Sequence, residues 1–60
     1  MYVIETCEDY ESGWECAAQC TSLDEALAKM ADLDLYDEWH AGWARLRKVG
    51  QRTFIPCRDL

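Results

Sequence analysis

Residues 22–33 read SLDEALAKMADL, and this stretch decides the fold because it carries both a start signal and the periodicity of an amphipathic helix. Ser22 can accept hydrogen bonds from the first free N–H groups of a helix, and Glu25, three residues later, completes a capping box. Apolar residues then recur at helical spacing and form one stripe, which consists of Leu23, Ala26, Leu27, Met30 and Leu33. The stretch therefore predicts a helix from about Leu23 to Leu33.

Two segments before this helix have the composition of β-strands. Residues 2–8, YVIETCE, are rich in β-branched and aromatic side chains. Residues 14–20, WECAAQC, alternate, and strict alternation would place four apolar side chains on one face, namely Trp14, Cys16, Ala18 and Cys20. Turn-forming residues occupy positions 9–13. We therefore expect a β-hairpin whose loop lies within 9–13.

A second hairpin is expected after the helix. Residues 34–42 are compatible with a loop, a further helical turn or the start of a strand. Residues 43–49 alternate again, and Gly50 suits the positive φ of a tight turn. Residues 53–55 form a short last strand, which Pro56 ends at a sheet edge.

These elements predict the order β-β-α-β-β and an α+β fold in which one amphipathic helix packs on one face of an antiparallel sheet. The other face would carry Arg45, Arg47 and several acids. The chain has 60 residues, which allows a single domain over residues 1–60. Half of the residues are hydrophobic, so a folded domain is favoured over a disordered tail.

The charge is strongly negative and unevenly distributed. The formal net charge is −6. Residues 1–38 hold eleven acids and one base, a net charge of −10, whereas residues 39–60 hold one acid and five bases, a net charge of +4. This balance argues against direct binding to nucleic acid or to an anionic membrane, and it favours a protein partner with a basic surface.

The chain has no apolar run near the ~18 residues of a membrane span. Its first residues, MYVIE, lack the basic and apolar regions of a signal peptide. We therefore expect a cytoplasmic protein whose four cysteines are reduced.

The cysteines predict neither a metal site nor another cofactor. Cys16 and Cys20 have the only short spacing, but on a strand they lie roughly 13 Å apart, which is too far for one zinc ion or for a disulfide. A Cys7–Cys16 disulfide and a zinc-stabilised domain remain alternatives to thiols that pack as small apolar groups.

No catalytic constellation is visible, so the chain is not expected to be an enzyme. His40 is the only histidine, and its spacing from the cysteines does not indicate a Cys–His pair. Carboxylates are numerous, but a chain of 60 residues rarely encloses the cleft that paired carboxylates need.

Acidic side chains give the sharpest functional hypothesis. They cluster at the first hairpin loop and just past the helix, and the candidate partner-binding residues are Glu8, Asp9, Glu11, Asp32, Asp34, Asp37 and Glu38. Carboxylates along one side of a rigid domain can imitate nucleic-acid phosphates and occupy a basic groove. A solvated acidic face that only maintains solubility is the alternative.

Aromatic side chains could anchor such an interface. Trp14 and Trp43 are expected on the core face of the sheet, whereas Tyr36 and Trp39 lie in or near an expected loop. We expect Tyr36 or Trp39 to serve as an apolar anchor, with core packing as the alternative for each ring.

The size, the β-β-α-β-β layout and the helix start SLDEAL after a strand resemble the small, acidic, cysteine-containing proteins of phages and prophages, among them the anti-CRISPR proteins. This resemblance implies inhibition by direct binding, often to the basic nucleic-acid-binding surface of a bacterial defence complex such as a CRISPR-Cas subunit, in the cytoplasm of a bacterial host. A second hypothesis is a small assembly module that forms a homodimer through a sheet edge or through the basic hairpin of residues 45–52.

Overall fold

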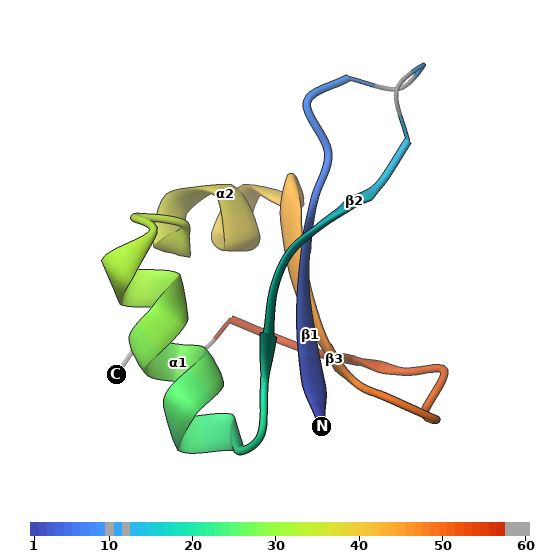
Figure 1. The fold of residues 1–60 in the computed structure, drawn as a ribbon. Coiled ribbons are helices and arrows are strands. Elements are labelled where there is room, and N and C mark those ends of the chain that lie inside the picture. The colour runs from blue at the N-terminus through green and yellow to red at the C-terminus, as the bar shows by residue number, and fades with distance from the viewer. Residues whose placement is uncertain (10, 12, 58–60) are drawn as a thin grey trace.

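The computed structural model describes residues 1–9, 11 and 13–57. It contains four strands and two helices in the order β1 (Tyr2–Thr6), β2 (Glu15–Cys20), α1 (Leu23–Asp32), α2 (Tyr36–Ala41), β3 (Ala44–Lys48) and β4 (Phe54–Ile55). The strands form one antiparallel sheet in the order β2-β1-β3-β4, and the helices pack on one face of it (Figure 1). The α+β layout is as the sequence predicts. The second helix, α2, lies in residues 34–42, which were compatible with a loop, a helical turn or a strand.

Helix α1 begins at the predicted cap. Ser22 Oγ accepts a hydrogen bond from the Glu25 backbone N–H at 3.1 Å, whereas Glu25 Oε2 accepts from the Thr21 backbone N–H at 2.9 Å and from the Thr21 hydroxyl at 2.6 Å. The carboxylate thus reaches one residue further back than in a standard capping box. The Thr21 hydroxyl, followed by the Thr21 backbone N–H, lowers the pKa of Glu25 because both bonds favour the charged carboxylate.

The core lies between α1, α2 and the inner face of the sheet. Its buried members are Ile4, Cys20, Ala26, Met30, Trp39, Ala44 and Leu46. Of the predicted helix stripe, Ala26 and Met30 are buried and Leu27 is half-buried, whereas Leu23 and Leu33 at the two ends are exposed. The centre of the stripe therefore supplies the contact with the sheet.

Strand β2 departs from the predicted alternation. Its register against β1 passes from Ile4↔Ala18 to Glu5↔Cys16, so Ala17 is one extra residue, a β-bulge. Cys20 and Ala18 face the helices, but Cys16 shares the face of Glu5 and is exposed. The prediction that Trp14, Cys16, Ala18 and Cys20 share one face is wrong because the bulge rotates the strand between them.

The second hairpin is closed by a tight turn, as predicted. Gly50 has φ +93°, which an L side chain rarely adopts, and Gln51 N–H donates to the Lys48 carbonyl at 3.0 Å. The last strand, β4, pairs with β3 over two residues and ends immediately before Pro56 at the sheet edge.

Candidate functional site

The antiparallel topology brings the predicted acids to one end of the sheet. The β1–β2 loop leaves the end of β1, α1 finishes at the same end, and α2 lies beside the start of β3 (Figure 1). We call this region the acidic end, and it contains Glu8, Asp9, Glu11, Asp32, Asp34, Asp37 and Glu38. All seven residues are exposed.

Within the acidic end the carboxylates form two groups rather than one continuous face. Glu8, Asp9 and Glu11 lie in the β1–β2 loop, and the other four lie on the α1–α2 side, with the start of β3 between the groups (Figure 1). The Asp9 carboxylate accepts a hydrogen bond from Glu11 N–H at 2.9 Å, and Asp32 pairs with Lys29 at 3.7 Å. Two of the loop's predicted positions, 10 and 12, lie outside the described residues.

The predicted anchors of this end belong largely to the interior. Trp39 is 7% exposed, and its indole N–H donates to the Ile55 carbonyl at 3.1 Å. Tyr36 is half-buried and donates its hydroxyl to the Leu27 carbonyl at 3.2 Å. The ring centroids of Tyr36 and Trp39 lie 5.9 Å apart. Trp39 therefore holds α2 against the sheet and presents no surface for a partner, which corrects its assignment as an exposed anchor.

The open face of the sheet, which faces away from the helices, holds a different charge cluster. Glu5, Arg45 and Arg47 share this face by register, as the alternation of residues 43–49 predicts. Glu5 Oε1 accepts a hydrogen bond from Arg45 Nε at 3.0 Å and from Arg47 Nε at 3.1 Å. Two of the four arginines in residues 39–60, Arg45 and Arg47, are thus engaged within the fold.

The electrostatics of Glu5 follow from this arrangement. Its side chain is 14% exposed, and burial alone would raise its pKa. The hydrogen bonds from Arg47 and Arg45, together with their charges, outweigh burial and lower the pKa of Glu5 below its usual value. Glu5 is therefore a charged, fully paired group at neutral pH.

Two aromatic rings enclose one of these arginines. The Arg45 guanidinium carbon lies 4.0 Å from the ring centroid of Trp14 and 4.6 Å from that of Phe54. Such contacts are cation–π interactions, and each ring also limits the access of water to the guanidinium. Trp14 is 38% exposed, so its predicted place in the core is wrong, because the bulge at Ala17 turns it to the open face.

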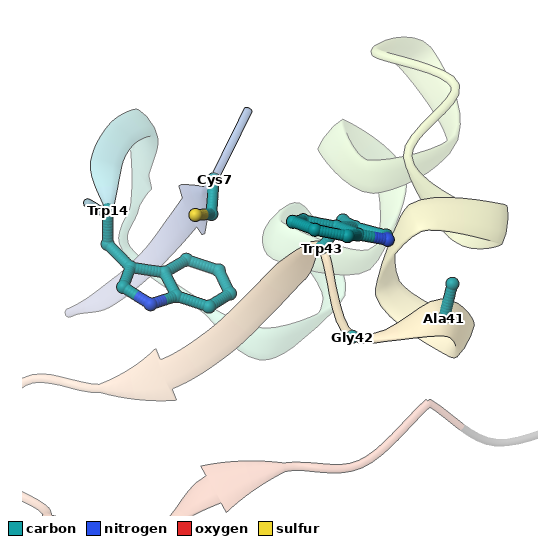
Figure 2. Close-up of a pocket in the computed structure, with 5 residues that line it drawn as sticks. All are labelled: Cys7, Trp14, Ala41, Gly42 and Trp43. Carbon is teal, nitrogen blue, oxygen red and sulfur yellow. The ribbon is translucent and has the colours of Figure 1, made fainter. Parts of the chain in front are cut away.

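A pocket lies between the β1–β2 loop and the segment that follows α2. It has a volume of about 280 Å³ and is lined by Cys7, Trp14, Ala41, Gly42 and Trp43 (Figure 2). We call it the Trp14–Trp43 pocket. Trp43 is also 38% exposed, so its predicted place in the core is wrong as well.

Local backbone geometry explains the position of Trp43. Gly42 ends α2 in the left-handed conformation at φ +95°, and Trp43 N–H donates to the Glu38 carbonyl at 2.7 Å. The Trp43 carbonyl then accepts a hydrogen bond from Cys7 N–H at 2.9 Å. This bond ties the β1–β2 loop to the end of α2, so the two walls of the pocket are held together by backbone.

The pocket was not identified from the sequence. Alternation over residues 14–20 places Trp14 in the core, and the bulge that overturns this has no strong local signature. For Trp43 two signals point away from the core. It shares the parity of Arg45 and Arg47, and Gly42 before it indicates a helix C-terminal cap and a change of chain direction.

The cysteines do not form a cluster. All four are free thiols, and Cys7 Sγ donates to the Asp9 carbonyl at 2.9 Å. Among the residues that the structure describes, no group of three or more His, Cys, Asp and Glu side chains could hold a metal ion. Within the same residues, no helix has the length and apolar character needed to cross a bilayer.

Comparisons with protein-family models, with curated proteins and with solved structures find no match to this chain.

Proposed function

We propose that this protein is a non-enzymatic inhibitor that binds a basic, nucleic-acid-binding surface of another protein through its acidic end. The observation that carries the proposal is the separation of charge in the fold. Seven exposed carboxylates lie at one end of the sheet, and two exposed acids, Asp24 and Glu25, lie at the start of α1. Arg45 and Arg47 are engaged with Glu5 on the open face. The negative charge of the acidic end is therefore available to attract a basic partner over several ångströms.

The resemblance to anti-CRISPR proteins in size, layout and charge suggests a class of partner. The proposed target is a nucleic-acid-binding subunit of a bacterial defence complex, and the proposed location is the cytoplasm of a bacterial host. Carboxylates in the β1–β2 loop and on α2 would occupy positions that phosphates take in the target's groove. The rigid connection of these segments through the Cys7–Trp43 backbone bond supports such mimicry, because it fixes their relative position.

The test is affinity capture from a bacterial lysate with tagged protein, followed by identification of the captured partner. A Glu8→Lys/Asp37→Lys variant reverses one carboxylate from each group and changes the net charge by +4, since each reversal contributes +2. We expect loss of the captured partner, with the far-ultraviolet circular dichroism unchanged, because both side chains are exposed.

A matched control carries the same charge change away from the acidic end. Asp24→Lys, Gln51→Lys and Thr53→Lys together also add +4, at exposed positions near the start of α1 and in the β3–β4 hairpin. Capture should survive in this control. Equal loss in both variants would show dependence on net charge alone, and retention in the first variant would refute the proposal.

A second candidate function is self-association. The β3–β4 hairpin carries Lys48 and Arg52 at the end of the sheet opposite the acidic end, so two copies could meet head to tail. Light scattering over a range of protein and salt concentrations tests this candidate. A dimer that dissociates with added salt would favour it, and a monomer under all conditions would exclude it.

A further inference from the structure

The Trp14–Trp43 pocket has the size and the walls of a site for a single side chain. Its volume of about 280 Å³ lies just below the range of about 300–1,000 Å³ that is typical of small-molecule sites. Two half-exposed indole rings form much of its lining, and the six-membered ring of Trp14 extends toward Trp43 (Figure 2). Aromatic walls of this kind suit a flat or cationic group.

The molecule already binds such a group on the same ring system. The Arg45 guanidinium lies 4.0 Å from the Trp14 ring centroid, in the arrangement expected of a cation–π contact. Glu5 pairs with both Arg45 and Arg47, so this cluster keeps a net charge of +1, and the attraction for a second cation has to come from the carboxylates of the acidic end. Trp14 thus shows directly that its ring can hold a guanidinium in this fold.

The charges around the pocket favour a cationic occupant. Cys7 on one wall is followed by Glu8 and Asp9, and the wall formed by residues 41–43 follows the helix that carries Asp37 and Glu38. A positive side chain in the pocket would therefore lie next to two segments that carry exposed acids. A neutral apolar side chain would gain nothing from these carboxylates.

We propose that the Trp14–Trp43 pocket receives an arginine side chain of the basic partner, with its guanidinium against the indole rings and within the field of the flanking carboxylates. This inference rests on the proposed function, and it names the chemical group that the acidic end recognises. Arginine fits better than lysine because its guanidinium is planar, stacks on aromatic rings and is more weakly hydrated than an ammonium group.

The test is a nuclear magnetic resonance titration of ¹⁵N-labelled protein with the peptide acetyl-Gly-Gly-Arg-Gly-Gly-amide. The indole N–H resonances of Trp14 and Trp43 should shift, and that of buried Trp39 should stay in place. The same peptide with citrulline in place of arginine has the same shape without the charge, and it should bind at least fivefold more weakly. The lysine peptide should fall between the two.

Trp43→Leu keeps an apolar side chain but removes the aromatic ring, and it should weaken arginine-peptide binding about fivefold, which corresponds to about 1 kcal/mol. Trp43→Phe keeps an aromatic ring and should retain most of the affinity. Leu23→Ala changes an exposed apolar side chain at the start of α1, outside the pocket lining, and serves as the control, with affinity unchanged. Dispersed amide resonances in each variant establish that it is folded.

The outcomes separate this inference from the proposed function. Absence of arginine-peptide binding, equal binding of the citrulline peptide, or shifts that leave both pocket indoles unchanged would overturn the arginine pocket. Partner capture that is lost in Glu8→Lys/Asp37→Lys would still uphold the acidic inhibitor in that case. Conversely, clear indole shifts with capture retained in that variant would uphold the pocket and refute the proposed function.

Discussion

The open face and the acidic end both carry charged residues, but they place them in different surroundings. On the open face, the Glu5 carboxylate is 14% exposed and bonded to Arg45 and Arg47. At the acidic end, Glu8, Asp37 and their neighbours are exposed to solvent. Charges in the first setting are part of the fold, because losing one partner leaves the others poorly solvated. Charges in the second setting can change with little effect on stability, and they remain available for binding.

The largest expected effect concerns the core residue beneath the acidic end. Trp39→Ala should lower the free energy of unfolding by about 3–5 kcal/mol, because it removes a buried ring and its hydrogen bond to Ile55. A loss of this size is comparable to the whole stability of a domain with 60 residues. Urea denaturation followed by circular dichroism measures it. Trp43→Ala is the control at a half-exposed ring, and an equal loss there would contradict the distinction between the two tryptophans.

The second prediction compares one carboxylate from each region. Glu5→Gln should destabilise the protein by about 1–3 kcal/mol, because two charged hydrogen bonds lose their anionic acceptor. Glu8→Gln should change stability by less than about 0.5 kcal/mol, since the side chain is exposed. Thermal and urea unfolding of both variants provide the measurement. Similar losses of stability in Glu5→Gln and Glu8→Gln would contradict the contrast between the open face and the acidic end.

The third prediction concerns pH. The pKa of Glu5 is lower in the folded protein than in the unfolded chain, so its contribution is fully present above the unfolded value of about 4.3 and is lost as the pH falls through the folded value. The stability difference between wild type and Glu5→Gln should therefore be largest near neutral pH and shrink below about pH 4. A difference that stays constant with pH would show that the charge of Glu5 does not stabilise the fold.

The smallest expected effect shows whether Asp34 contributes to stability through its backbone conformation or through its carboxylate. Asp34 has φ +55°, a left-handed conformation that aspartate tolerates better than β-branched residues do. Asp34→Val should cost about 1 kcal/mol, whereas Asp34→Asn should be neutral within about 0.5 kcal/mol. Asp34→Gly should be no less stable than wild type, because glycine adopts this conformation freely. If Asp34→Asn were as costly as Asp34→Val, the carboxylate itself would be structural.

The parts of the fold that the sequence predicted are those with strong local signals. Ser22 and Glu25 mark the start of α1, and Gly50 marks the second hairpin turn, because capping and positive φ are determined by one or two side chains. The second helix has no side-chain cap, and the burial of Trp39 against the sheet holds it in place. That contact is tertiary, so the local sequence did not favour helix over loop.

Clustering along the chain indicates acids on one side of the domain, whereas the fold places Glu8, Asp9 and Glu11 in the β1–β2 loop and the other four acids on the α1–α2 side. Neither this division nor the pocket follows from the sequence alone. The sequence does not indicate the exposure of Trp14, because Ala17 is bulged out of the ladder, which places Trp14 and Cys16 on the face opposite Ala18 although strict alternation places them together. The exposure of Trp43 depends on the change of direction at Gly42. Both determinants lie in the backbone rather than in the tryptophans themselves.

Because Ala17 has no partner in β1, the first hairpin can lose this residue without losing a strand pair. If Ala17 were deleted, Glu5 could still pair with Cys16 and Thr6 with Glu15, now in an unbroken ladder. Deletion of Ala17 would therefore leave the Trp14 indole on the open face beside Arg45, and the length of β2 at this point is not what fixes the position of that ring.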